Sequence, residues 1–340
     1  MRKVKVQDAL GMVLCHDITR IVPGQFKGPA FKKGHVVTSE DIPELLNLGK
    51  DHLYVWECGE DYLHENEAAI RIAGASAGKG ISLSDPAEGK VNYLAEHRGL
   101  LKINVEGLNR VNSIEEVIIS TRHTNQVVGK GDLLAGTRVI PLVIKKEKIE
   151  QVEEICGSTG PLLEVREMLP RRTGLVTTGN EVYYGRIQDR FGPVIREKLK
   201  EFDCEVFDQV ILPDDLHAIT AAVQGLAARG AEMIITTGGM SVDPDDVTPA
   251  AVRATGAEIV SYGAPVLPGA MFLVAFLGDI PVLGLPACVM YFKATVFDLI
   301  LPRVLAGERL TRKDLAGMGH GGLCLGCSQC RYPLCSFGKC

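Results

Sequence analysis

The feature that most constrains the fold of this chain is an alternation of strand and helix patterns between Leu169 and Gly307. Short apolar runs such as Met233–Thr237 alternate with longer segments, such as residues 214–229, in which apolar side chains recur at helical spacing. Parallel strands are joined by crossover helices that cover the sheet. The alternation therefore predicts an α/β domain with a mostly parallel sheet and helices on both faces.

The same pattern predicts the individual elements of this domain. Strands are expected at residues 174–178, 204–212, 233–237, 271–276 and 282–285, and helices at 190–202, 214–229 and 289–305. Either Asp214 or Asp215 would cap the second of these helices. Thr248 would cap a further short helix, with Pro249 at the first helical position. Proline suits this position because the N–H that it lacks would have no partner within the helix.

Before this domain the sequence predicts a smaller part that is mixed α+β and rich in strands. The first segment holds a short helix with Ser39 as its N-cap, and then a strand at 52–56. The second holds a helix at 62–73, a flexible loop at 74–80 and β-like runs at 101–105, 117–120 and 137–144. The expected boundaries are 1–56 for the N-terminal α/β segment, 57–150 for the β-rich middle region, 169–307 for the α/β domain and 310–340 for a cysteine-rich tail.

Composition narrows the class of protein. The chain has 340 residues, of which 46% are hydrophobic, enough for the cores of about two domains. A net charge of −5 argues against a nucleic-acid-binding protein, which needs a basic face. The most apolar stretch, 271–285, is too short and too interrupted to span a bilayer, and the N-terminus lacks the apolar core of a signal peptide. We expect a cytoplasmic protein without nucleic-acid or membrane partners.

Three loops follow strands of the predicted sheet, where α/β proteins bind ligands. They cover residues 177–181, 236–249 and 284–288. In the second loop, Gly238 and Gly239 let backbone N–H groups approach an anion. The side chains that would assist are the hydroxyls of Thr237 and Ser241 and the carboxylates of Asp243, Asp245 and Asp246, which suit Mg²⁺. The alternative is a glycine turn before an acidic helix start.

The first and third loops are less specific. Glu181 in the first loop either faces a ligand or is a solvated turn residue. Cys288 in the third loop is expected to be a small buried side chain rather than a nucleophile, because no histidine lies near it in the sequence.

The loops together resemble a known domain. The motifs are Thr178-Gly179-Asn180-Glu181, the run from Ile235 to Val242 followed by Asp246, Pro268-Gly269, and Gly284-Leu285-Pro286. In this order they resemble the molybdenum-cofactor biosynthesis domain, shared by pterin adenylyltransferases, molybdopterin molybdenumtransferases and the N-terminal domain of the competence/damage-inducible proteins. Ala9–Leu14 and Asp17-Ile18 weakly resemble the opening of the molybdenumtransferases.

The resemblance implies a function and a set of site residues. The function is molybdopterin binding in cofactor biosynthesis, with insertion of molybdate into adenylylated molybdopterin in the presence of Mg²⁺. Asp246 and Glu181 would be catalytic, with Asp246 also handling the metal. The residues that would bind the pterin are Thr178, Gly179, Thr237, Gly238, Gly239, Ser241 and Pro286. The resemblance also implies a homodimer. Docking to other cofactor-assembly proteins or to a molybdoenzyme is a further expectation, in which the cysteine tail would contact the partner.

Departures from the family pattern leave alternatives open. After Pro286 the transferases carry Gly-Asn-Pro, whereas this chain has Ala287-Cys288-Val289. Around Pro268-Gly269 they carry lysines, which this chain lacks. The Met-Asp-Gly-Tyr-Ala motif and the C-terminal β-barrel of the transferases are also missing. The alternatives are a molybdopterin adenylyltransferase, a non-catalytic pterin carrier or redox sensor, and a nucleotide-derivative hydrolase.

The cysteines indicate a second site. Of ten in the chain, five crowd the tail, at Cys324, Cys327, Cys330, Cys335 and Cys340. The first three have the spacing of an iron–sulfur run, with Cys335 or Cys340 as the fourth ligand. Zinc is the rival, since four thiolates also form a closed tetrahedral site, and His320 could replace one of them. A disordered, reactive tail is disfavoured because exposed thiols oxidise readily.

Overall fold

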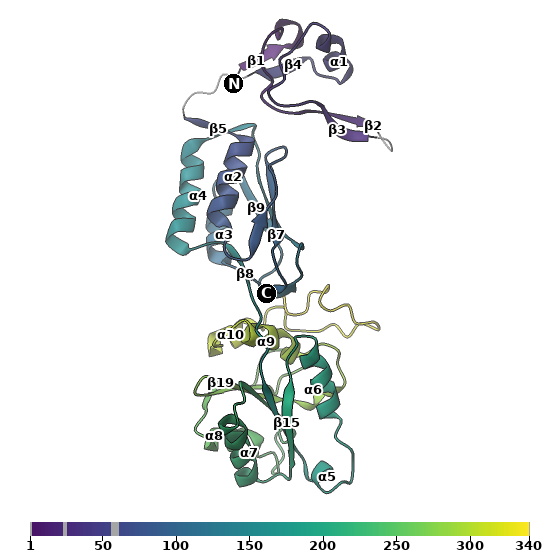
Figure 1. Ribbon diagram of the computed structural model, residues 1–340, viewed down its shortest axis with the longest axis vertical. Helices are drawn as coiled ribbons and strands as arrows, with labels where there is room; N and C mark the ends of the chain where they lie inside the picture. Colours follow the sequence, from purple (N-terminus) through teal and green to yellow (C-terminus); the bar gives the residue numbers. More distant parts are fainter. Residues whose placement is uncertain (1, 23–25, 56–60, 340) are drawn as a thin grey trace. The chain divides into compact units, whose positions relative to one another are not determined.

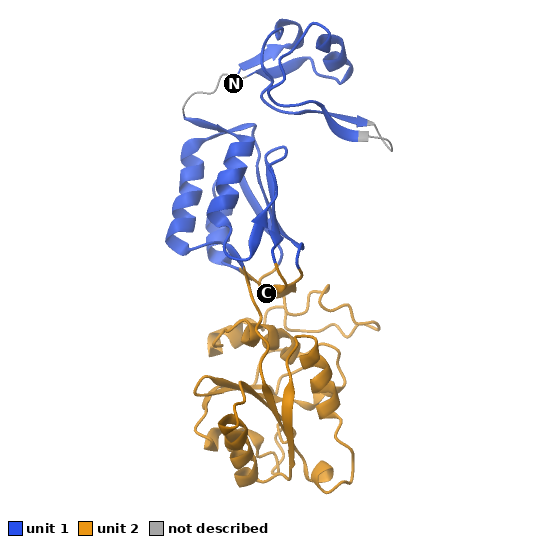
Figure 2. Cartoon of the chain, in the orientation of Figure 1, with its two compact units in different colours: residues 1–96, 103–122, 130–164 blue, residues 97–102, 123–129, 165–340 orange. Residues whose placement is uncertain are grey.

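The computed structural model describes residues 2–22, 26–55 and 61–339. These residues form two compact units (Figure 2). Unit 1 contains residues 1–96, 103–122 and 130–164, and unit 2 contains residues 97–102, 123–129 and 165–340. No helix within the described ranges is long and apolar enough to cross a membrane.

Unit 2 is built on a six-stranded sheet with the order β15-β14-β16-β19-β18-β17. The strands are β14 (Thr173–Thr178), β15 (Val206–Leu212), β16 (Met233–Thr237), β17 (Glu258–Tyr262), β18 (Leu273–Leu277) and β19 (Ile280–Leu285). β14 pairs in parallel with both β15 and β16, and β16 pairs in parallel with β19. β18 runs opposite to the other five strands and pairs antiparallel with both β17 and β19. The predicted mostly parallel sheet is confirmed.

Helices cover both faces of this sheet (Figure 1). They are α6 (Phe191–Lys200), α7 (Leu216–Ala228), α8 (Thr248–Ala254), α9 (Val296–Leu305) and α10 (Arg312–Gly317), whereas α5 (Asn180–Tyr183) is a short turn after β14 that buries no residue. Ile235 in β16 packs into a core with α6 and α9, whereas Ile234 packs into a second core with α7 and α8. Successive strand residues thus face opposite helical layers, which makes β16 apolar on both sides.

Two helix starts in unit 2 differ from the sequence prediction. The helix expected at 289–305 is a short 3-10 turn, Ala287–Met290, followed by a loop, and α9 begins only at Val296. Thr295 and Asp298 form a capping box there, with the Thr295 N–H donating to Asp298 Oδ2 over 2.7 Å, which fixes the later start. Thr248 is the first residue of α8 rather than its N-cap.

The capping alternative at α7 is resolved. Asp215 caps the helix, because its side chain accepts the Ala218 N–H over 2.7 Å. Asp214 is left to bond elsewhere.

Unit 1 contains several small sheets and three longer helices. The N-terminal elements are β1 (Arg2–Lys5), η1 (Val6–Asp8), the hairpin β2 (Ile18–Val22) and β3 (Phe26–Phe31), α1 (Asp41–Asn47) and β4 (His52–Val55). A four-stranded antiparallel sheet follows, with β6 (Ile81–Leu83), β7 (Lys90–Ala95), β11 (Leu133–Val139) and β9 (Val117–Thr121) in that order. The remaining elements are β5 (Tyr62–His64), β12 (Val143–Lys145), α2 (Glu65–Ser76), α3 (Val105–Asn112) and α4 (Lys146–Thr159). A further sheet, in the order β10 (Gln126–Val128), β8 (Gly99–Ile103) and β13 (Leu163–Arg166), consists mostly of residues that belong to unit 2.

The sequence prediction for this region was wrong in several places. The helix expected at 62–73 begins at Glu65 and ends at Ser76, because residues 62–64 form β5 and pair with β12. The loop expected at 74–80 is therefore partly helical. Ser39 does not cap α1; the Asp41 carboxylate instead accepts the Thr38 N–H over 2.8 Å. The predicted strand end at Trp56 lies outside the described residues.

Candidate functional site

The carboxyl ends of the parallel strands in unit 2 open onto a cleft of about 1080 Å³. This volume reaches the upper end of the range for ligand sites, roughly 300–1,000 Å³. The cleft is lined by Thr178, Gly179, Asn180, Glu181, Val182, Arg186, Ile187, Gln188, Asp189, Arg190, Phe191, Asp214, Gly238, Gly239, Asp243, Pro244, Asp245, Asp246, Met290 and Tyr291. These residues come from the loops that follow β14, β15, β16 and β19.

The strand order explains why the cleft forms here. The chain passes from β14 to the edge strand β15 and then returns to β16, on the other side of β14. The connections after β14 and β16 therefore leave in opposite directions and leave a crevice at the carboxyl ends of these two strands. Such a switch point is where open α/β sheets bind their ligands.

Two glycines form the floor of the cleft next to β16. Gly238 has φ +86° and Gly239 has φ +55°, both in the left-handed region that favours glycine. A Cβ at position 238 would lie 2.1 Å from the backbone oxygen of Thr178, and one at 239 would lie 2.7 Å from Thr248 Oγ1. The close approach to Thr178 of β14 at position 238, and to Thr248 of α8 at position 239, thus requires glycine at both positions.

Hydrogen bonds tie the loops around the cleft together. The Asn180 N–H donates to Asp214 Oδ2 over 2.9 Å, which joins the loop after β14 to the loop after β15. Thr178 Oγ1 and Thr248 Oγ1 lie 3.3 Å apart in the buried layer below the cleft. The Thr248 N–H donates to the Gly239 oxygen over 3.2 Å. These hydrogen bonds within the protein fix the backbone that forms the floor of the cleft.

Tyr262 in β17 supports the glycine loop from the side. Its hydroxyl donates to the backbone oxygens of Met240 and Ser241, over 2.8 and 3.1 Å. Burial raises the pKa of Tyr262, and the nearby Asp246 carboxylate raises it further. The phenol therefore stays protonated and keeps its role as a donor.

The charges around the cleft are mostly negative. The carboxylates are those of Glu181, Asp189, Asp214, Asp243, Asp245 and Asp246, and the cations are Arg186 and Arg190. Both carboxylate oxygens of Asp189 already accept hydrogen bonds within the protein. Oδ1 accepts the Phe191 N–H over 2.8 Å, and Oδ2 accepts from Gln209 Nε2 over 2.7 Å. Asp246 Oδ2 accepts the Asp243 N–H over 2.9 Å, which orders the acidic turn. A phosphate ligand would meet repulsion here unless a cation accompanied it.

The structure brings most of the predicted site residues together. Those that line the cleft are Thr178, Gly179, Glu181, Gly238, Gly239 and Asp246. Thr237, Ser241 and Pro286 are not among the lining residues as described. The Thr237 hydroxyl is buried and donates to Thr177 Oγ1 over 3.4 Å, Pro286 is buried, and Ser241 is exposed outside the lining.

Sequence reasoning missed other parts of the lining. Asp214 could have been found, because it follows a strand just as Gly238 does. Arg186, Arg190 and Tyr291 have no local signal, since only the packing of their loops brings them to the cleft.

The four described cysteines of the tail line a second cavity in unit 2, of about 330 Å³. They are Cys324, Cys327, Cys330 and Cys335. Cys340 lies outside the described residues. Within residues 2–22, 26–55 and 61–339, no three His, Cys, Asp or Glu side chains are gathered in a geometry that could hold a metal ion. Cys288 is half-buried, and burial raises the pKa of its thiol.

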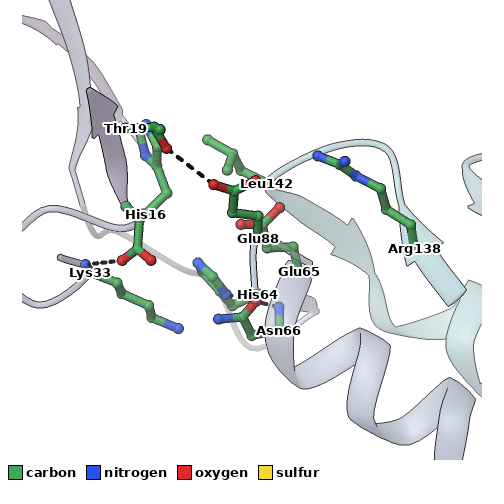
Figure 3. A pocket seen from close by; sticks show the side chains of 10 residues that line it. His16, Thr19, Lys33, His64, Glu65, Asn66, Glu88, Arg138 and Leu142 are labelled. Atoms are coloured by element: carbon green, nitrogen blue, oxygen red, sulfur yellow. Dashed lines mark hydrogen bonds between the residues drawn. The ribbon is translucent and has the colours of Figure 1, made fainter. Parts of the chain in front are cut away.

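A third cavity, of about 190 Å³, lies in unit 1 (Figure 3). Its lining includes the buried side chains of His64 and Glu65 at the start of α2, with Lys33 and Arg138 nearby. His64 Nδ1 accepts the Asn66 N–H over 3.1 Å, so its Nε2–H donates to the Cys15 oxygen. Burial lowers the pKa of His64 and raises the pKa of Glu65.

Two parts of the chain match known family models. Residues 174–306 match the family model described as "Probable molybdopterin binding domain". The match covers nearly the whole sheet of unit 2 and confirms the predicted resemblance to a cofactor-biosynthesis domain. Residues 3–57 match a model described as "Domain of unknown function (DUF8806)".

Individual relatives match over shorter stretches. A "CinA-like protein" of Mycobacterium sp. (strain MCS) is 42% identical over 90 residues, which is 26% of this chain and 21% of the relative. The "CinA-like protein" of Mycobacterium avium (strain 104) is 41% identical over the same shares. The chain therefore spans about a fifth of the length of the curated relatives it matches.

Solved structures give a weaker likeness. The molybdopterin biosynthesis enzyme MoaB of Thermus thermophilus is 23% identical, covering 41% of this chain and 98% of that chain, with a TM-score of 0.33. A CinA protein of Thermoplasma acidophilum is 16% identical, covering 40% and 98%, with a TM-score of 0.35. These TM-scores are too low to establish a common fold, so the domain assignment depends on the family match.

Proposed function

We propose that the cleft of unit 2 binds molybdopterin and that the protein acts in the assembly of the molybdenum cofactor. The observation that supports this most is the glycine floor at the switch point, inside the segment that matches the molybdopterin-binding family. Gly238 and Gly239 expose their backbone to the cleft with no side chain in the way. A terminal phosphate is the part of the ligand that such a bend suits best.

We propose that Mg²⁺ accompanies the ligand. The cleft carries more carboxylates than guanidinium groups, so a bare phosphate would be repelled. Asp214, Asp243, Asp245 and Asp246 offer hard oxygen donors of the kind that Mg²⁺ takes alongside substrate phosphates. The ion would offset the negative charge of the phosphates. In this proposal Asp246 holds the ion, and Gly238 and Gly239 hold the phosphate.

The finer proposal is insertion of molybdate into adenylylated molybdopterin. Glu181 and Asp246 both line the cleft, from the loops after β14 and β16, and can face a ligand from two sides. A molybdopterin adenylyltransferase is the enzyme alternative.

A second candidate is a pterin carrier without catalysis. The cations among the described lining residues are Arg186 and Arg190, and the family's lysines near Pro268 are replaced by Leu267 and Ala270. Fewer cations favour binding of one anionic ligand over the joint binding of pterin and molybdate.

Further parts of the proposal concern the tail and partners. We propose a metal at the tail cysteines, with iron–sulfur and zinc as the two chemistries. A homodimer and docking to a cofactor-assembly protein or a molybdoenzyme stay predictions.

The full-length chain tests the proposed function directly. Fluorescence titration with molybdopterin, with and without Mg²⁺, should show binding that Mg²⁺ strengthens. Asp246→Asn should lower the Mg²⁺-dependent affinity about tenfold, the size expected for one lost charge-assisted contact. Asp279→Asn is the matched control, because Asp279 is fully exposed and lies outside the cleft lining.

Turnover separates the two candidates. Loss of adenylate from adenylylated molybdopterin on addition of molybdate would support the insertion enzyme. Tight binding with no turnover would support the carrier. Absence of any pterin binding by a folded chain would overturn both.

A further inference from the structure

The cysteine-lined cavity of unit 2 carries an inference that goes beyond pterin binding. One wall is the tail, with Cys324, Cys327, Cys330 and Cys335, and the other is the loop 291–294 that follows the 3-10 turn. The chain between Cys324 and Lys339 forms turns and bends rather than helices or strands. A segment of this kind has few backbone bonds of its own to hold it.

The tail is nevertheless anchored at both ends. The Cys324 N–H donates to the Leu267 oxygen over 2.8 Å, and the Gly338 N–H donates to the Gly321 oxygen over 2.9 Å. Between these points Phe337 is buried, and Tyr332 Oη donates to the Asp298 oxygen over 3.3 Å. The four cysteines therefore lie on a loop that is fixed to α9 and to the loop around Leu267, not on a free end.

The size of the cavity favours a cluster over a single ion. A zinc ion sits about 2.3 Å from each of four thiolate sulfurs and fills the space between them. The space here is about 330 Å³, whereas about 10–15 Å³ on a comparable measure is enough to hold one water molecule. All four described thiols line this one space, and among the described residues no three are gathered as a single-ion site would require. Room of this kind suits the iron and sulfide core of a cluster.

The charges around the cavity point to the same ligand. Lys293 and Arg331 line it, and none of its described lining residues is acidic. A cluster with four thiolate ligands is anionic, so two neighbouring cations stabilise it. The aromatic side chains of Phe292, Tyr332 and Phe337 form much of the remaining wall and shield the core from water.

We infer that Cys324, Cys327, Cys330 and Cys335 bind a [4Fe–4S] cluster in this cavity. Each thiol releases its proton as its sulfur bonds to iron, and ferrous iron, ferric iron and sulfide come from solution in the ratio of one to one to two, so that no electron has to be removed as the core assembles. Cys327 and Cys330 are exposed, so the cluster is open to solvent on one side and sensitive to oxygen.

The cluster would border the ligand cleft. Tyr291 lines both the cysteine cavity and the cleft, at the end of the 3-10 turn that follows β19. The presence of the cluster should therefore order the loop that closes one side of the cleft. This last step rests on the proposed function, whereas the cluster itself does not.

Anaerobic purification of the full chain tests the inference. Reconstitution with ferrous iron, ferric iron and sulfide should give roughly four iron and four sulfide per chain, and reduction with dithionite should give the paramagnetic signal of a reduced cluster. Zinc without sulfide, or no metal after reconstitution, would overturn it. Because these measurements need no variant and no pterin, they stand apart from the test of pterin binding.

Variants test the ligand set. Cys327→Ser and Cys335→Ser should each lose the cluster, while Cys340→Ser and Cys288→Ser should keep it. Retention in Cys335→Ser with loss in Cys340→Ser would reject Cys335 as the fourth ligand. Urea unfolding of each variant, without metal, shows whether unit 2 stays folded.

Discussion

The cleft of unit 2 and the small cavity of unit 1 both gather titratable side chains, but they do so differently. In the cleft, Glu181, Asp243 and Asp245 are exposed around a floor of backbone. In the cavity, His64 and Glu65 are buried, with 1% and 7% of their surface exposed. Exposed charges remain available to a ligand, whereas buried ones make folding depend on pH. The difference predicts that substitutions in the cleft change ligand binding, whereas substitutions in the cavity of unit 1 change how stability depends on pH.

The largest expected effect tests the rigid floor of the cleft. Gly238→Ala would place a methyl group 2.1 Å from the Thr178 oxygen, at a positive φ that alanine disfavours. We expect a loss of about 3 kcal/mol in the free energy of unfolding, measured by urea denaturation, and loss of pterin binding.

Gly256→Ala is the matched control for that variant. Its φ of +88° is close to that of Gly238, but nothing lies within 4 Å of the added Cβ. We expect a cost of about 1 kcal/mol from backbone strain alone. Equal losses in the two variants would show that the floor is not tightly packed against β14.

The second prediction concerns the buried carboxyl of unit 1. Burial raises the pKa of Glu65 above its ordinary value, so the folded state favours the neutral acid. Its contribution to stability is full below the pKa of the unfolded chain and is lost as pH rises through the folded pKa. Glu65→Gln should therefore raise the free energy of unfolding at neutral pH by roughly 1 kcal/mol and have little effect in acid.

Glu67→Gln supplies the control, because Glu67 is exposed on the same helix. Urea midpoints at neutral pH and in acid would separate the two variants. A variant at position 65 that was less stable at neutral pH would mean that the carboxylate is bound by a cation in the folded state.

The same contrast explains how far the sequence could predict the structure. Met233–Thr237 was predicted to the residue, because an apolar strand buried on both faces has a strong local signal. The cleft residues next to it followed from the rule that ligands bind beyond strand ends. Tyr62–His64 was read as helix, since its strand character comes from pairing with residues 143–145, far along the chain. Contacts of that range leave no local pattern.

The candidate site divides in the same way. Gly238, Gly239 and Asp246 lie in one continuous motif and were predicted together. Asp214 was interpreted only as a possible helix cap, although it follows a strand, and its bond with Asn180 joins two loops that are far apart in sequence. In the cavity of unit 1 the lining comes from many separate segments, and no motif marked it.

The third prediction tests whether the exposed cations of the cleft hold a ligand. Arg186→Gln should weaken pterin binding about threefold, because an exposed charge contributes on the order of 1 kcal/mol or less. The effect should shrink at high salt, where exposed charges are screened. Arg253→Gln, on the exposed side of α8, should leave the affinity unchanged. Equal effects from the two arginines would indicate general attraction by net charge rather than a contact in the cleft.

The smallest expected effect concerns His64 in the cavity of unit 1 and the pH dependence of stability. His64 holds Asn66 through Nδ1 and the Cys15 oxygen through Nε2, so a second proton on the ring would break the bond that caps α2. Burial is the main cause that lowers the pKa of His64 below its ordinary value. A depressed pKa gives stability that is present above the unfolded pKa and is lost as pH falls.

The test uses a Glu65→Gln background, because Glu65 makes stability change with pH in the opposite direction. In this background the free energy of unfolding should fall by a few tenths of a kcal/mol between about pH 7.5 and 5.5. His64→Asn keeps an acceptor for the Asn66 N–H without titrating, and should flatten that slope, whereas the exposed His52→Asn should not. A slope that survives His64→Asn would place the pH dependence in other groups of the cavity, of which His16 is the first to test because burial also lowers its pKa.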